Sequence, residues 1–172
     1  YGARSTALIK ADVAKYQQLY TGIDGIFFDE ASNDDTPANI AYYTEITTYA
    51  HGRSLTPVYL NAGTDIPDSF YSAAGMFDYI VVYENNTYPA VIDLDMPTGA
   101  TRDNRSSMVY NQALNTINIQ EMLAKTKMVY VSDCGAGYDT LPTYIDALFG
   151  LCASGSTELI VTSLTLTTAS GS

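Results

Sequence analysis

The segment Gly25-Ile26-Phe27-Phe28-Asp29-Glu30 is a short apolar run that ends in two carboxylates. A run of this kind, without alternating polar positions, predicts a strand that is buried in a parallel sheet. The pattern recurs at residues 77–84, where an apolar run ends in Glu84. Two further apolar runs end in amides, at Asn61 and at Asn111-Gln112. Polar groups therefore follow four of the predicted strands.

Helices and strands alternate on both sides of this segment. Periodicity and capping residues predict strands at 23–28, 57–61, 77–83, 107–111 and 128–132, with a short final strand at 158–162. They predict helices at 5–20, 36–51, 68–74, 119–125 and 142–153, and a long polar loop at 85–104. This alternation implies a parallel sheet with helices outside it.

Such a sheet can be an open, doubly wound sheet or a closed barrel. No glycine-rich phosphate loop follows any predicted strand, which removes the main sign of a dinucleotide-binding fold. Polar residues at the ends of several strands are typical of the eight-stranded barrel, which has about 250 residues. We therefore expect an α/β fold of the (β/α)₈ TIM type. The chain would supply the last five units as a partial barrel domain at 1–161, with three strands before Tyr1, and a Ser/Thr-rich tail or linker would follow at 162–172.

Charge and composition narrow the choice of partners. The formal net charge is −11 and the sequence pI is about 4.1, so the surface repels phosphate backbones and nucleic acid is not expected. The same charge attracts a cationic substrate, or it only keeps the protein in solution. No apolar run approaches the roughly 20 residues that cross a bilayer, so no transmembrane segment is expected.

Several features favour an extracellular protein, secreted or at the cell surface. Fifteen tyrosines stand against no tryptophan and only eight Lys and Arg residues. Sequons at Asn85 and Asn104 permit N-glycosylation, and we prefer Asn104 because a glycan on Asn85 would crowd Glu84. Cys134 and Cys152 can form a disulfide in an oxidising compartment or remain buried thiols.

The two strand-end acids suggest a chemistry. Asp29 and Glu84 can face one cleft from nearby strands, and glycoside hydrolysis uses two carboxylates across a cleft. The alternative is that they are helix caps, loop residues or ion-pair partners. The spacing of Asn33-Asp34-Asp35 with Glu30 does not match a dedicated metal-binding loop, so neither a metal nor a cofactor is expected. His51 lies at a helix end, away from the strand ends, which disfavours a Ser-His-Asp triad or thiol catalysis.

A combination of short segments resembles the spherulin-4-like family over nearly the whole chain, up to about residue 153. The segments are Tyr1-Gly2-Ala3-Arg4, Gly25 to Glu30, Pro57 to Thr64, Asp78 to Glu84, Val129 to Asp133 and Tyr138 to Pro142. The resemblance implies a (β/α)₈ barrel on secreted or cell-surface proteins. It also implies endo-acting hydrolysis of α-1,4-linked galactosamine and N-acetylgalactosamine polymers, which are cationic when deacetylated.

By the same resemblance, Asp29 is expected to be the nucleophile or electrostatic stabiliser and Glu84 the general acid/base, with Glu30 as a supporting contact. Further substrate contacts are expected at Tyr1, Arg4, Asn61, Tyr83, Asn111, Asp133 and Tyr138. A preceding segment or a partner chain is expected to complete the barrel. The alternative function is a non-catalytic, structural or glycan-binding barrel protein of the cell surface or matrix.

Overall fold

Five parallel strands form one sheet in the computed structural model, which describes residues 3–155. The strands follow one another in chain order across the sheet, and each pairs in parallel with the next. They are β1 (Ile26–Phe28), β2 (Val58–Asn61), β3 (Tyr79–Asn85), β4 (Arg105–Val109) and β5 (Met128–Val131). The carboxyl ends of all five strands therefore lie along one edge of the sheet.

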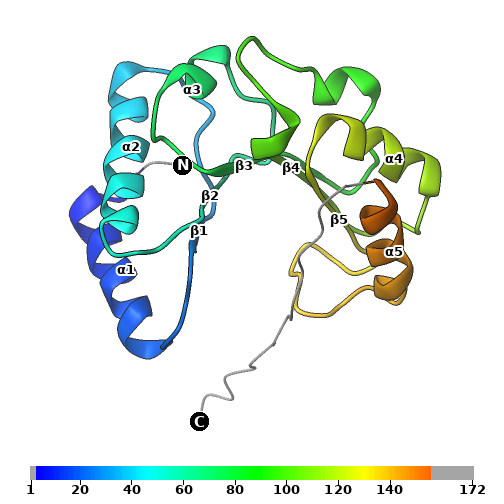
Figure 1. The fold of residues 1–172 in the computed structure, drawn as a ribbon, viewed down its shortest axis with the longest axis horizontal. Helices are drawn as coiled ribbons and strands as arrows, with labels where there is room; N and C mark the ends of the chain where they lie inside the picture. The colour runs from blue at the N-terminus through cyan, green and yellow to red at the C-terminus, as the bar shows by residue number, and fades with distance from the viewer. Residues whose placement is uncertain (1–2, 156–172) are drawn as a thin grey trace.

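The helices lie around the outside of the strands (Figure 1), with α1 and α2 beside β1 and β2, and α4 and α5 beside β5. They are α1 (Thr6–Leu19), α2 (Pro37–His51), α3 (Asp68–Ser72), α4 (Thr116–Lys125) and α5 (Ile145–Gly155). Two 3₁₀ turns, η1 (Val91–Leu94) and η2 (Arg102–Asn104), occupy the long segment between β3 and β4.

Local sequence explains where the helices begin. The hydroxyl of Ser5 accepts a hydrogen bond from the backbone of Leu8 and caps α1, and the side chain of Asn115 caps α4 in the same way. Thr36 is the N-cap of α2 and Pro37 its first residue, as the sequence predicts. These three helices therefore start at residues whose chemistry favours that position.

The order of strands and helices predicted from the sequence is confirmed for the described residues, but some bounds are wrong. β4 begins at Arg105 rather than at residue 107, and Arg105 is fully buried. α5 begins at Ile145, because Pro142 to Tyr144 still belong to the loop after β5. The predicted strand at 158–162 and the tail at 162–172 lie outside the described residues.

The two faces of the sheet differ in composition. Val58, Leu60 and Ile80 are fully buried and belong to the hydrophobic clusters that join the sheet to its helices. The opposite, inner face presents a row of aromatic rings in neighbouring register, in which Tyr59 stacks on Tyr79 at 4.8 Å and lies 6.2 Å from Phe27. Phe27 is 48% exposed because β1 is an edge strand of this sheet.

A β-bulge in β3 determines which face Glu84 joins. Val81 pairs with Ser106 but Tyr83 pairs with Ser107, so Val82 is an extra residue on β3. Strict alternation would place Glu84 on the helix side with Ile80 and Val82, which belong to the core cluster. The extra residue shifts the alternation by one position, as bulges near functional sites do. Glu84 therefore turns to the inner face, and Tyr83 turns into the core instead.

The two cysteines do not form a disulfide. The Sγ atom of Cys134 lies 3.7 Å from the carbonyl oxygen of Leu141, whereas that of Cys152 lies 3.9 Å from the carbonyl oxygen of Val129. Both side chains are half-buried, whereas the sequence allowed a disulfide or buried thiols. None of the helices among residues 3–155 is long and apolar enough to cross a membrane.

Candidate active site

Three side chains from neighbouring strands meet at the carboxyl edge of the sheet. Asp29 follows β1 directly, Asn61 ends β2 and Glu84 lies near the end of β3. The amide nitrogen of Asn61 donates hydrogen bonds to Asp29 Oδ1 at 2.8 Å and to Glu84 Oε2 at 2.7 Å. One amide group thus joins the two acids that the sequence singled out.

The separation of the two carboxylates follows from these bonds. Because both bonds end on the same nitrogen atom, Asp29 Oδ1 and Glu84 Oε2 are at most about 5.5 Å apart. Carboxyl groups about 5 to 5.5 Å apart are typical of retaining glycosidases, and about 6.5 to 9.5 Å is typical of inverting ones. The bound joins one oxygen of each acid, and it is compatible with the shorter separation.

Glu84 is held at both of its oxygens. Tyr138, in the loop after β5, donates its hydroxyl to Glu84 Oε1 at 2.8 Å, and Asn61 holds Oε2. Edge-on ring contacts with Tyr110 at 6.3 Å and Tyr130 at 5.8 Å fix the Tyr138 ring. Burial, followed by the hydrogen bond to Glu84, raises the pKa of Tyr138, so its hydroxyl stays protonated as a donor.

Within the described residues, Asp29 is held at one oxygen only. Its Oδ1 accepts the Asn61 bond and a second one from the backbone nitrogen of Glu30 at 2.9 Å. Its Oδ2 lies outside these bonds, and the residue is exposed. Asp29 and Glu30 line a cavity of about 720 Å³ beside β1, together with side chains of α1 and α2. Asp29 can therefore offer a carboxylate oxygen to a ligand in that cavity.

The backbone is left-handed at several points along this edge. Glu30 has a φ of 55°, Asn111 54° and Tyr138 48°, and they follow β1, β4 and β5 respectively. Gly63, after β2, has a φ of 63°. Left-handed residues other than glycine cost free energy and concentrate at functional sites. Their clustering here supports a functional role for this edge.

The other predicted contacts are dispersed. Arg4 lines the same cavity as Asp29, where its guanidinium pairs with Asp12 at 2.7 Å. Asn111 is exposed after β4. Tyr83 is in the hydrophobic core and its hydroxyl bonds to Thr87 at 3.0 Å, so its prediction as a substrate contact is wrong. The bulge explains the error, because it exchanges the faces of Tyr83 and Glu84. Tyr1 lies outside the described residues.

Asp133 holds the loop after β5. Its carboxylate accepts hydrogen bonds from the hydroxyl of Thr143 at 2.5 Å and from the Thr143 backbone at 3.0 Å. These two bonds lower the pKa of Asp133, and the bond from the Thr143 hydroxyl has the larger effect. The same loop presents Tyr138, so Asp133 supports a residue of the site, and its own contact with substrate stays a prediction.

The two sequons differ in exposure. Asn85 is exposed at the end of β3, whereas Asn104 is half-buried in η2 and its side-chain oxygen is buried. Accessibility thus favours Asn85, the reverse of the sequence-based preference, and glycosylation at either residue stays a prediction.

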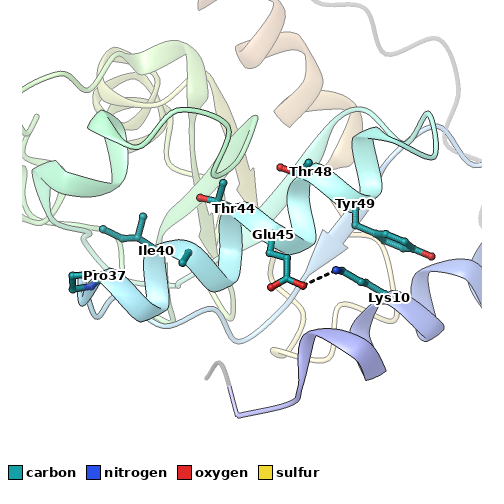
Figure 2. Close-up of a pocket in the computed structure, with 8 residues that line it drawn as sticks. Lys10, Pro37, Ile40, Thr44, Glu45, Thr48 and Tyr49 are labelled. Carbon is teal, nitrogen blue, oxygen red and sulfur yellow. Dashed lines mark hydrogen bonds and ion pairs between the residues drawn. The ribbon is translucent and has the colours of Figure 1, made fainter.

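A second hollow, of about 780 Å³, lies on the outer side of the molecule between α1 and α2. Figure 2 shows its lining, in which Lys10 of α1 pairs with Glu45 of α2 at 2.5 Å. Its walls are mainly apolar, and the carboxylates at the strand ends are not among its lining residues. We therefore place the candidate active site at Asp29, Asn61, Glu84 and Tyr138.

Comparison with known proteins gives a family. The profile of spherulation-specific family 4, Spherulin4, matches residues 1–151. Spherulin-4 of Physarum polycephalum is 30% identical in a region that covers 84% of this chain and 47% of that protein. The chain thus spans about half the length of the curated relative it matches.

Comparison with solved structures supports the fold. A crystal structure of a "putative fructose-1,6-biphosphate aldolase" from Coccidioides immitis is similar with a TM-score of 0.52. The match covers 89% of this chain and 60% of that one, at 14% identity. Identity this low bears on the fold alone, and it agrees with a TIM-type arrangement of the five strands.

Proposed function

Because the chain belongs to spherulation-specific family 4, and because one asparagine brings Asp29 and Glu84 together, we propose that it is a glycoside hydrolase. The observation that supports this best is the short separation of two carboxylates at the carboxyl edge of a parallel sheet. Two carboxyl groups in this arrangement suit the cleavage of a glycosidic bond, because that reaction needs one acid and one nucleophile or base.

The hydrogen bonds suggest the role of each acid. Asp29 is the proposed nucleophile, since its Oδ1 is oriented by two donors while Oδ2 stays available. Glu84 is the proposed general acid/base, and its Oε1 would give a proton to the leaving oxygen once the Tyr138 hydroxyl moves away from that position. Glu30, exposed on the cavity beside Asp29, is proposed as a supporting contact.

The bound of about 5.5 Å favours retention of configuration. In the first step, Asp29 Oδ2 forms a bond to the anomeric carbon while the bond to the leaving oxygen breaks and Glu84 gives its proton to that oxygen. In the second step, Glu84 takes a proton from water, the water oxygen bonds to the anomeric carbon, and Asp29 leaves as a carboxylate. The product keeps the starting configuration.

The proposed substrate is a polymer of α-1,4-linked galactosamine or N-acetylgalactosamine, as the family resemblance implies. A deacetylated polymer is cationic, and the formal charge of −11 would attract it. The family resemblance also implies secreted or cell-surface proteins, so we propose that the protein is secreted or displayed at the cell surface.

We also propose that these strands are part of an eight-stranded barrel. In the described sheet, β1 is an edge strand, and a cavity lined by Phe27 and Phe28 runs beside it. Further β/α units, from the same polypeptide or a partner chain, would pair with β1 and cover these rings. Whichever chain supplies them, they would form the remaining wall of the cleft.

A non-catalytic, glycan-binding or structural role is the second candidate. It is favoured by one observation, that both oxygens of Glu84 already accept hydrogen bonds from Tyr138 and Asn61. A carboxylate held in this way can serve as a fixed acceptor for sugar hydroxyls without taking part in any reaction.

Hydrolysis of galactosamine polymer by purified protein separates the two roles. We expect wild type to release oligosaccharides, Glu84→Gln to lose at least about 10²-fold in rate, and both to bind the polymer. Glu121→Gln, at an exposed position of α4, is the matched control and should behave as wild type. Binding without hydrolysis by wild type would support the second candidate, and equal rates for wild type and Glu84→Gln would remove Glu84 from the reaction.

A further inference from the structure

Asn61 is placed unusually for a residue of a substrate cleft. It is only 7% exposed, between Asp29, which is exposed, and Glu84, which is half-buried. Both hydrogens of its amide nitrogen are used, one for each carboxylate. A residue this buried, with both donors engaged by the protein, has no donor left for a ligand.

The oxygen of the Asn61 amide makes no comparable hydrogen bond within the described residues. The Oδ1 atom of Asn61 is buried and has no hydrogen-bond partner within the described residues. A buried acceptor without a partner reduces the stability of the fold. The orientation of the amide is nevertheless fixed, because its nitrogen donates to an oxygen of each acid and the amide oxygen could only accept. The position of Asn61 therefore serves the two acids rather than the fold.

The backbone around Asn61 is tied to both neighbouring strands. Its carbonyl oxygen accepts a bond from Ala31, two residues after Asp29, at 2.6 Å. Two residues after Asn61, Gly63 donates to the Val81 oxygen at 3.1 Å and accepts from the Glu84 nitrogen at 2.9 Å, which spans the bulge. The amide is thus held on a rigid base between the segments that bear the two carboxylates.

We propose that Asn61 is a positioning residue that sets the separation and mutual orientation of Asp29 and Glu84. The proposal rests on the proposed function, because the two carboxylates matter together only if they act together. It replaces the expectation that Asn61 contacts substrate. Two hydrogen bonds from one nitrogen atom fix one oxygen of each acid relative to the other.

Two substitutions separate this role from simple packing. Asn61→Ala removes both bonds and frees the carboxylates to move apart. We expect kcat to fall about 10²-fold, since displacement of a catalytic group by about 1 Å has an effect of that size, with KM changed less than about threefold. The melting temperature should stay within about 3 °C of wild type, because the orphaned oxygen is removed together with the bonds.

Asn61→Asp keeps the size of the side chain and replaces the donor with a third acid. We expect the acidic limb of the pH–rate profile to move to higher pH by about one unit or more, because a like charge opposes ionisation of its neighbours. Asn33→Asp adds the same charge at an exposed position of the loop after β1 and should leave the profile unchanged. Wild-type kcat in Asn61→Ala, or an unmoved profile in Asn61→Asp, would overturn the proposal.

A measurement without substrate keeps the two proposals apart. The carboxyl carbons of Asp29 and Glu84, labelled with ¹³C, can be titrated by NMR in wild type and Asn61→Asp. Midpoints that move to higher pH in the variant support the bridge even if no polymer is cleaved, in which case only the proposed hydrolase function fails. Midpoints that coincide in the two proteins refute the bridge whether or not wild type is active.

Discussion

Carboxylates are hydrogen-bonded at both ends of the sheet, but with different partners. At the amino end, Asp78 Oδ2 accepts a bond from the Val58 backbone at 2.7 Å and lies 2.8 Å from Nε2 of His51, the last residue of α2. At the carboxyl end, Asp29 is bonded to Glu30 and to Asn61, and Asn61 also holds a second acid.

The difference separates a carboxylate with a structural role from one with the proposed catalytic role. Asp78 links a strand to a helix and brings no second acid with it. Asp29 shares its donor with a second acid, lies next to the left-handed residue Glu30 and lines a cavity. Two acids joined by one amide at the carboxyl end, compared with the single acid Asp78 at the amino end, support the proposal that the carboxyl end is the functional one.

The largest effect that would test this comparison is on catalysis. We expect Asp29→Ala to lose about 10³-fold or more in kcat/KM, because removal of a nucleophile removes the first step, while the free energy of unfolding changes by less than about 1 kcal/mol. Added azide should restore part of the rate if Asp29 is the nucleophile, because a small anion can enter the vacated space. If Asp29→Ala hydrolysed polymer at the wild-type rate, Asp29 would have no more part in the reaction than Asp78 has.

The reverse outcome is expected at the amino end. Asp78→Ala leaves the Val58 nitrogen and His51 without their partner, and we expect a loss of about 1 to 3 kcal/mol in the free energy of unfolding, measured in urea. The kcat/KM should stay within about twofold of wild type at a temperature where the variant is folded. Equal stability in the two proteins would mean that Asp78 does not hold α2 to the sheet.

The amino acid pattern predicted much of the fold and the identity of the two acids. Alternating apolar runs and capped helices are local signals, which is why the five strands and their order were predicted correctly for the described residues. Bounds were wrong where local signals mislead. Arg105 looks like a loop residue, yet it is buried as the first residue of β4.

The sequence did not predict how the side chains of the candidate site are arranged. Val82 lies in an unbroken apolar run, and nothing in that run marks it as the extra residue that turns Glu84 inward. The role of Asn61 depends on distances between three strands, which no spacing along the chain encodes. The glycine at position 63 is a signal that could have been used, because it closely follows β2, where the chain turns with a positive φ.

Gly63 provides a smaller test of the comparison. A Cβ there would lie 3.6 Å from Glu84 Oε2, an ordinary contact, but at a φ of 63°. The matched control is Gly75, with a φ of 75° and nothing within 4 Å of its Cβ. We expect Gly63→Ala and Gly75→Ala each to lose about 1 to 2 kcal/mol of stability, because both strain the backbone. Only Gly63→Ala should also lower kcat/KM, and a similar loss in Gly75→Ala would mean that strain alone, not contact with Glu84, reduces activity.

The smallest expected effect concerns the alkaline stability of the loop that reaches Glu84. Because burial and Glu84 raise the pKa of Tyr138, the folded chain keeps this proton at a pH where the unfolded chain, with a tyrosine pKa of about 10, has lost it. The contribution of Tyr138 to stability is complete below about pH 10 and is lost as the pH rises above that value.

Tyr138→Phe has no such proton. Its free energy of unfolding should therefore fall less steeply between pH 9 and 11 than that of wild type, with a difference in slope of under about 1.4 kcal/mol per pH unit. Tyr16→Phe, on the exposed side of α1, is the control and should keep the wild-type slope. If Tyr138→Phe kept that slope as well, the hydroxyl would not be bound to Glu84 in solution, and Glu84 would be free at Oε1 without any movement of the loop.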